Sequence, residues 1–159
     1  MGLYEQEIQS ASSKYGIPTE IIRAIIQVES SWNRNAYRAE LKINDASWGL
    51  MQVLYRTAQW LGYSGPTEGL YDPATNINLG TKYLKYQWDR YGIWEDVFAA
   101  YNAGTAKRKS DGTYINQAYV DKVKTALQKI AKNTIGFSGS SNGIVDSIIG
   151  QKKNHISGS

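Results

Sequence analysis

The chain has 159 residues, the length of one ordinary domain, which can bury a core without disulfide bonds or a structural metal. It contains no cysteine, and its single histidine is His155, so thiolate nucleophiles, Ser-His-Asp triads and multi-histidine zinc sites are excluded. The net charge of +4 favours an anionic partner. Any catalysis must therefore come from carboxylate, tyrosine, lysine or backbone groups.

The spacing of apolar residues is helical along most of the chain and predicts an all-α domain. The predicted helices cover about residues 3–15, 18–30, 49–61, 73–91, 94–102 and 119–130. Gly16 suits the end of the first helix, and Pro18 and Pro73 suit the first turns of the second and fourth. The stretch 32–48 predicts a polar loop, because no run there alternates between apolar and polar residues.

The composition changes after residue 132. Gly and Ser make up 11 of the last 27 residues, which predicts a domain over 1–132 and a flexible tail or linker over 133–159. The apolar piece 144–149 either packs on the domain or begins another region of a longer parent protein, and the second alternative is slightly favoured. The sequence predicts no membrane span and no classical signal peptide, and it is interpreted as a monomeric domain.

The second predicted helix places a carboxylate on its apolar face. At about 100° per residue, Glu29 falls in the middle of an arc of aliphatic residues. The members of this arc are Ile21, Ile22, Ala24, Ile25, Ile26 and Val28. Desolvation there would raise the pKa of Glu29, as a glycosidic general acid requires. The alternative is that Glu29 bends out to solvent or pairs with a basic residue, and the wheel alone does not decide.

Three segments, in order, carry a family resemblance. They are Val-Glu-Ser-Ser-Trp-Asn at 28–33, Gly-Leu-Met-Gln-Val at 49–53 and Ala-Ala-Tyr-Asn-Ala-Gly at 99–104. They resemble the motifs of the soluble lytic transglycosylase family, and supporting residues extend the resemblance over about 15–128. The supporting residues are Thr57-Ala58, Asp72 to Ile77, Gly80, Tyr83-Leu84, Tyr119-Val120 and Val123.

The resemblance implies a lysozyme-like helical fold with Glu29 as the single catalytic acid. No metal or cofactor is expected, because the chain has no cysteine, one histidine and no loop of clustered oxygen ligands of the EF-hand kind. The family cleaves the β-1,4 bond between N-acetylmuramic acid and N-acetylglucosamine of peptidoglycan and leaves a 1,6-anhydro sugar. By the same resemblance, the candidate substrate-binding residues are Ser47, Met51, Gln52, Tyr101, Asn102 and Tyr119. The alternatives are that Gln52 and Asn102 cap helix ends and that Met51 and Tyr101 belong to the core.

Three positions depart from the family pattern. Residues 40–45 are bulkier and more charged than the usual small-residue connection, Tyr55 replaces a common proline, and Ile115 replaces a common acidic residue. These departures concern contacts with the glycan and not the acid.

Two rival functions remain open. A goose-type-lysozyme-like hydrolase would need a second carboxylate, for which Asp45 is the best candidate. The other is a cell-wall binding module, which would hold glycan without cutting it. The hypothesis of nucleic-acid binding has less support, because the basic residues are scattered along the chain. The expected setting is extracellular or facing a cell wall, either in a phage tail or virion, which is favoured, or in a larger secretion or conjugation protein.

Overall fold

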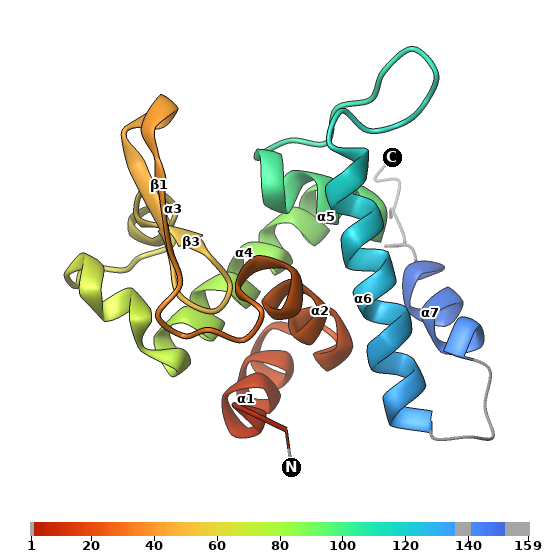
Figure 1. Ribbon diagram of the computed structural model, residues 1–159, viewed down its shortest axis with the longest axis horizontal. Coiled ribbons are helices and arrows are strands. Elements are labelled where there is room, and N and C mark those ends of the chain that lie inside the picture. The colour runs from red at the N-terminus through yellow and green to blue at the C-terminus, as the bar shows by residue number, and fades with distance from the viewer. Residues whose placement is uncertain (1, 136–140, 152–159) are drawn as a thin grey trace, which may run out of the picture. The chain divides into compact units, whose positions relative to one another are not determined.

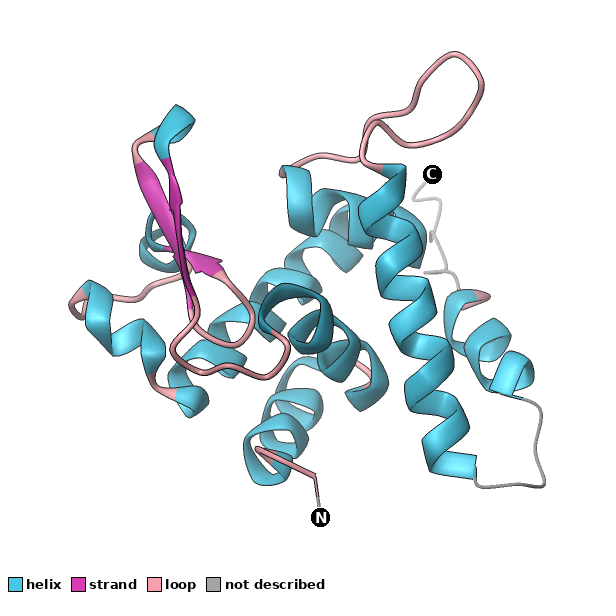
Figure 2. Cartoon of the chain, viewed as in Figure 1, coloured by secondary structure: helices cyan, strands magenta, loops and turns pink. Residues whose placement is uncertain are grey.

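The computed structural model describes residues 2–135 and 141–151 (Figure 1). Its contacts divide the chain after Tyr83 into two compact units, Met1–Tyr83 and Leu84–Ser159, and the division falls inside the long helix α4 (Pro73–Tyr91). Figure 2 shows that helices dominate and that a few short strands accompany them. The helices predicted before and after residues 49–61 are present, with ends that differ from the predicted ends by at most five residues.

The first unit is built on two amphipathic helices, α1 (Glu5–Tyr15) and α2 (Thr19–Ser30). Helix α1 ends at Gly16, which adopts a φ of 68° that glycine tolerates without strain. Pro18 precedes α2, and its carbonyl accepts the N–H groups of Ile21 and Ile22. Helix α2 supplies much of the core of this unit, because its aliphatic residues from position 21 to 26 are fully buried.

A small antiparallel sheet occupies much of the stretch predicted as a polar loop, and that prediction is wrong for these residues. Strands β1 (Tyr37–Glu40), β2 (Asp45–Trp48) and β3 (Val53–Leu54) follow the order β1-β2-β3, and the short helix η1 (Leu41–Ile43) closes the hairpin between the first two. Tyr37 pairs with Trp48 in the register of the hairpin. The side chains of β1 are mostly exposed, so the strand lacks the alternation that marks a half-buried strand.

The prediction of a helix over residues 49–61 is also wrong for the first half of that range. Only α3 (Tyr55–Trp60) is helical there, and the helix η2 (Thr67–Tyr71) follows it. Gly49 has a φ of 74° and Gln52 a φ of 50°, both in the left-handed region, which a right-handed helix does not allow. Residues 49–52 therefore form a turn between β2 and β3.

The second unit contains the end of α4 together with α5 (Trp94–Ala103), α6 (Gln117–Ile135) and α7 (Ser141–Ile149). Trp94 stacks on Trp88, with ring centroids 4.3 Å apart. Helix α6 packs against both α5 and α7, and Val145 and Ile148 of α7 are buried.

Of the two alternatives for residues 144–149, packing on the domain is therefore the one observed. Helix α6 continues three residues beyond the predicted domain end, to Ile135. The boundary at residue 132 itself stays a prediction, and the tail residues 136–140 and 152–159, including His155, lie outside the described residues.

Candidate active site

The predicted acid lies on the last turn of α2. The helical neighbours of Glu29, at positions 22, 25 and 26, are isoleucines that are fully buried, and Glu29 itself is half-buried. Glu29 therefore lies at the border between the apolar face of the helix and the surface of the unit. The helical wheel correctly placed this residue beside the aliphatic face.

The end of α2 is tied to the second motif. Ser31 and Trp32 adopt φ values of 49° and 68°, and these two consecutive left-handed residues stop the helix. The indole of Trp32 turns back and donates a hydrogen bond to Gln27 Oε1 at 2.9 Å. The hydroxyl of Ser30 donates to the carbonyl of Leu50 at 2.7 Å, so the residue after Glu29 is bonded directly to the 49–52 turn.

A buried asparagine from α4 holds this turn in place. Asn76 is fully buried, its Oδ1 accepts the N–H of Met51 at 2.7 Å, and its Nδ2 donates to the carbonyls of Trp48 at 2.7 Å and Leu70 at 2.8 Å. A Cβ at Gly49 would come within 2.5 Å of Asn76 Nδ2. The glycine of the motif is thus required both by its positive φ and by the closeness of this amide.

The other predicted residues of the first unit lie on or beside the turn. Gln52 Nε2 donates to the carbonyls of Ala36 and Gly49 at 3.1 and 3.0 Å, so this side chain bonds to the backbone. Neither carbonyl belongs to a helix, so these bonds do not cap a helix end. Met51 is fully buried, and a Cβ at Gly80 would meet its Sδ at 2.5 Å, which fits the core alternative. Ser47 is buried in β2. Direct contact of these side chains with a substrate stays a prediction.

The predicted residues of the second unit gather where α5 ends and α6 begins. Tyr101 is buried, Asn102 is exposed and Tyr119 is half-buried. Asn116 joins the two helices, because its Nδ2 donates to the carbonyl of Ala99 at 3.0 Å and to Asn102 Oδ1 at 2.9 Å. The carbonyl of Asn116 accepts the N–H of Tyr119 at 3.0 Å. The third motif and the start of α6 are therefore connected through one residue.

The loop 104–116 is anchored on α5 by a buried phenol. The hydroxyl of Tyr114 donates to Asp96 Oδ1, and Arg108 donates to the same hydroxyl at 2.7 Å and lies over the ring at 4.3 Å. Burial raises the pKa of Tyr114 well above its ordinary value, and the hydrogen bond to the Asp96 carboxylate raises it further. Tyr114 therefore stays protonated and keeps donating, which fixes the loop just before Asn116.

Two positioning residues were missed from the sequence. Asn76 appeared only within the supporting stretch 72–77, and Asn116 was not singled out. The available signal for Asn76 was its helical spacing with Gly80 and Leu84 on the predicted buried face of the helix, the same kind of signal that identified Glu29. No comparable signal marks Asn116, because its partners depend on how α5 and α6 pack.

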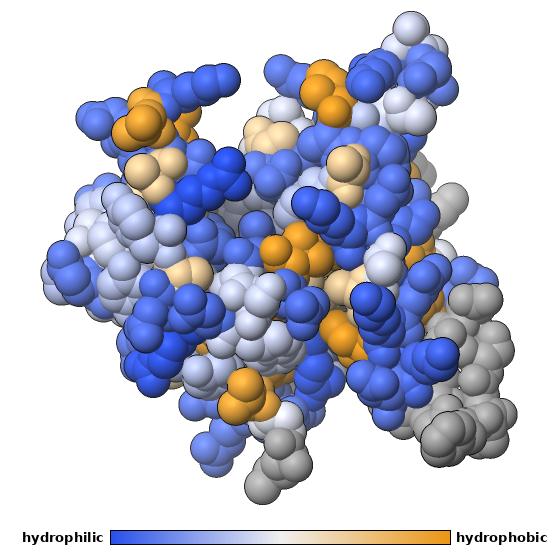
Figure 3. All heavy atoms as spheres, viewed as in Figure 1, coloured by the Kyte–Doolittle hydropathy of each residue, from blue (hydrophilic) through white to orange (hydrophobic). Residues whose placement is uncertain are grey.

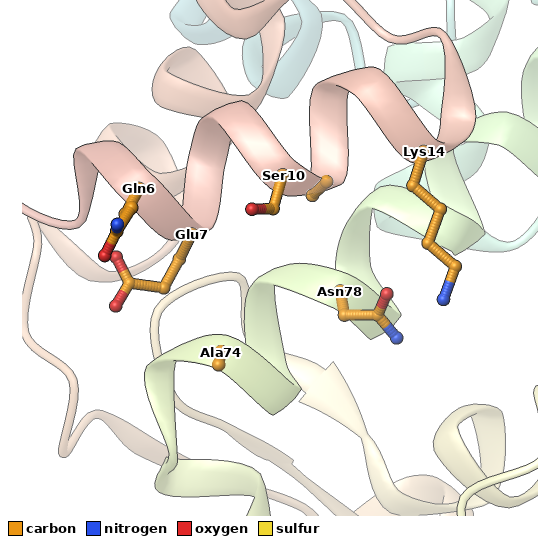
Figure 4. A pocket seen from close by; sticks show the side chains of 7 residues that line it. Gln6, Glu7, Ser10, Lys14, Ala74 and Asn78 are labelled. Carbon is orange, nitrogen blue, oxygen red and sulfur yellow. The ribbon is translucent and has the colours of Figure 1, made fainter.

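Two other surface features of the first unit lie apart from the motifs. A groove of about 440 Å³ lies between α1 and α4, with Glu7 and Lys14 among its lining residues and none of the predicted site residues. Figure 4 shows these lining side chains on the two helices. At the tip of the β1–β2 hairpin, Leu41 is 87% exposed and Ile43 is 45% exposed. In Figure 3 apolar surface is visible at the upper left, where Figure 1 places this hairpin. The unusual 40–45 segment is thus the exposed tip of a hairpin.

Neither a metal site nor a membrane span is found in the described chain. Within residues 2–135 and 141–151, His, Cys, Asp and Glu side chains do not gather in groups of three or more that could hold a metal ion. No helix in the same ranges has the length and apolar character needed to cross a membrane.

Sequence comparisons connect the chain to cell-wall enzymes. The family model described as "Transglycosylase SLT domain" matches residues 6–122. Soluble lytic murein transglycosylase of Escherichia coli K12 is 36% identical over 113 residues, which cover 65% of this chain and 16% of that protein. Membrane-bound lytic murein transglycosylase C of Photorhabdus laumondii is 38% identical over 139 residues, which cover 80% of this chain and 38% of the relative. The chain thus spans well under half the length of these relatives.

Solved structures give the same fold. The 70 kDa soluble lytic transglycosylase from Escherichia coli superposes with a TM-score of 0.71 at 25% identity, covering 94% of this chain and 27% of that one. An inactive mutant of the lytic transglycosylase Slt from Pseudomonas aeruginosa, in which a glutamate is replaced by glutamine, gives a TM-score of 0.67 at 19% identity over 87% of this chain and 25% of that one. The second likeness concerns the fold alone. The helix-rich, lysozyme-like fold expected from the motifs is confirmed.

Proposed function

This chain belongs to the transglycosylase SLT domain family, and on that premise we propose that it is a peptidoglycan lytic transglycosylase with Glu29 as its single catalytic acid. The proposed reaction cleaves the β-1,4 bond between N-acetylmuramic acid and N-acetylglucosamine and forms a 1,6-anhydromuramic acid end. The observation that carries the proposal is the half-buried Glu29 at the end of α2, inside the first of three motifs that the family match covers.

One carboxylic acid is sufficient for this reaction. Glu29 gives its proton to the glycosidic oxygen as the bond from that oxygen to the anomeric carbon of the muramic acid breaks. The 6-hydroxyl oxygen of the same sugar then bonds to the anomeric carbon, and the Glu29 carboxylate takes the hydroxyl proton. Because the nucleophile is tethered to the sugar, its effective concentration is high and no second carboxylate has to activate water.

The arrangement around Asp45 favours this mechanism over hydrolysis. Asp45 Oδ1 accepts the N–H of Ala46 at 2.7 Å, and Asp45 Oδ2 accepts the N–H of Arg56 at 3.1 Å. Both carboxylate oxygens are thus engaged with backbone groups that join β2 to the start of α3. This use supports a structural role for Asp45 and not the role of a water-activating base.

Mass spectrometry of the fragments released from purified peptidoglycan tests the proposal. Fragments with anhydro ends are the expected product. Fragments with reducing ends would identify a lysozyme-like hydrolase, and a result without released fragments would favour a binding module. The matched control is Glu29→Gln, which keeps the shape of the side chain and cannot deliver a proton. Turnover should fall by a factor on the order of 100 or more while the circular dichroism spectrum stays unchanged. Full activity of Glu29→Gln would refute the assignment of the acid.

We propose peptidoglycan glycan strands as the partner and a wall-facing location for the chain, acting as a monomer. A phage tail or virion is the favoured setting within that proposal. Antibodies against the chain should then detect it in purified particles, and detection only in host cell fractions would count against the phage setting.

A further inference from the structure

The amide of Asn116 has its orientation fixed by a group that can only accept a hydrogen bond. Its Nδ2 lies 3.0 Å from the carbonyl oxygen of Ala99, and that oxygen carries no proton. The NH2 side of Asn116 must therefore face α5. The same nitrogen lies 2.9 Å from the side chain of Asn102, so its second N–H donates to Asn102 Oδ1.

The orientation of Asn116 determines that of Asn102. With Oδ1 held by Asn116, the NH2 group of Asn102 occupies the other side of its amide. Asn102 is exposed, and its side chain makes no further hydrogen bond within the described ranges 2–135 and 141–151. Asn102 therefore presents two N–H donors to the surface, and its Oδ1 already accepts one hydrogen bond.

The position of Asn116 itself is fixed from two sides. Its carbonyl accepts the N–H groups of Tyr119 and Val120 in the first turn of α6. The preceding loop is held on α5 by Tyr114, whose hydroxyl bonds to Asp96 and Arg108. Asn116 cannot turn away from Asn102 without breaking the start of α6 or the Ala99 bond.

We propose that Asn116 is a positioning residue, which fixes the amide of Asn102 as a hydrogen-bond donor toward a carbonyl or hydroxyl oxygen of the glycan. This inference rests on the proposed function, because it takes a glycan with N-acetyl groups as the ligand. Asn116 acts through Asn102 and does not touch the sugar. Removing the Asn116 side chain leaves the Asn102 amide free to rotate. Replacing Asn116 with Asp reverses the orientation of the Asn102 amide, because a carboxylate at position 116 attracts the NH2 group of Asn102.

A double-mutant cycle separates positioning from a general structural role. All proteins carry Glu29→Gln, and the dissociation constant for tetra-N-acetylchitotetraose is measured by calorimetry. Asn116→Asp should weaken binding by about 3- to 10-fold when Asn102 is present, the effect of one hydrogen bond, and should have no effect when Asn102→Ala is also present. Gln117→Ala, which removes a side-chain bond to the N–H of Tyr114 at the start of α6, is the control and should leave binding unchanged.

Side-chain amide signals in NMR give a readout that does not depend on turnover. The NH2 signals of Asn116 should exchange slowly with water, and those of Asn102 should exchange quickly and shift when the oligosaccharide is added. Any of three results would overturn the inference: equal losses of affinity from Asn116→Asp with and without Asn102→Ala, Asn102 signals that do not shift, or no binding of the oligosaccharide. Release of anhydro fragments by the wild-type chain would in those cases leave the proposed function intact, so the two failures are distinguishable.

Discussion

Replacing Asn76 with Asp exchanges one NH2 group for an oxygen in the interior of the first unit. Asn76 is fully buried, accepts one N–H from Met51 and donates to the carbonyls of Trp48 and Leu70. Aspartate keeps the acceptor and loses both donors. A carboxylate oxygen would then face two carbonyl oxygens, and the side chain would lose two of its three bonds, one to Trp48 at the end of β2 and one to Leu70 in η2.

The expected loss of stability is large and depends on pH. Each buried carbonyl without a donor costs about 1–3 kcal/mol, so the variant should lose about 2–6 kcal/mol before the cost of burying a charge is added. Burial and the two carbonyls raise the pKa of the introduced carboxyl above its unfolded value of about 3.9. Since the folded pKa is the higher one, the variant should be most stable below about pH 4 and should lose stability as the pH rises through the folded pKa.

Denaturant unfolding at several pH values from 4 to 7, followed by tryptophan fluorescence, measures this effect. Asn78→Asp is the control, because it makes the same change on the same helix at a half-exposed side chain. Asn78 Oδ1 accepts the hydroxyl of Tyr15 at 2.9 Å, and aspartate keeps that bond. The control should lose less than about 1 kcal/mol. A loss of the same size in both variants at pH 7, or a difference that does not change with pH, would refute the role given to Asn76.

The remaining predictions concern the second carboxylate, metals and the tail. Asp45→Asn should keep turnover within about 3-fold of the wild-type value, because the side chain retains one oxygen that can accept a backbone N–H and the reaction needs no base at this position. A loss as complete as that of Glu29→Gln, together with reducing ends in the wild-type products, would indicate a hydrolase. Peptidoglycan cleavage should persist in excess chelator, and a loss that a divalent ion restores would contradict the metal-free mechanism. Truncation after Lys132 should leave cleavage at 25 °C intact, in line with the proposed domain boundary. Its melting temperature should fall by about 5–10 °C, because the buried Val145 and Ile148 are removed; lost activity would place the boundary elsewhere, and an unchanged melting temperature would mean that α7 contributes nothing.

Helices such as α2 could be predicted because their buried residues recur at helical spacing. The aliphatic residues of α2 recur at helical spacing and are buried as expected, and Gly16 ends the preceding helix as its position suggested. The hairpin could not be predicted in this way, since β1 is held by backbone pairing and exposes most of its side chains. The turn at 49–52 was missed for a related reason: Gln52 has a positive φ that its residue type does not signal, and its side chain bonds to the carbonyl of Ala36, 16 residues away.

The motifs locate the candidate site along the chain, but they do not identify its supports. Asn76 and Met51 are 25 residues apart, and Asn116 and Asn102 are 14 apart. Such pairs form only after the helices pack, so no local pattern predicts them. The sequence could place Glu29 beside an apolar face, whereas the hydrogen bonds of Gln52 to the backbone and the contact of Met51 with Gly80 became visible only in the structure.

The two supporting asparagines solve the same chemical problem in the two units. Each must satisfy backbone groups inside the fold and also hold another group in one orientation, and a primary amide offers donors and an acceptor without a charge. Aspartate has the right length and lacks the donors, whereas glutamine has the donors and is one methylene too long for a position packed between fixed carbonyls. Substitutions at Asn76 and Asn116 should therefore be poorly tolerated, although neither residue is a candidate for contact with the substrate. At Asn76 we expect the loss in stability, because the side chain is fully buried, and at Asn116 we expect it in glycan affinity, because its partner Asn102 is exposed.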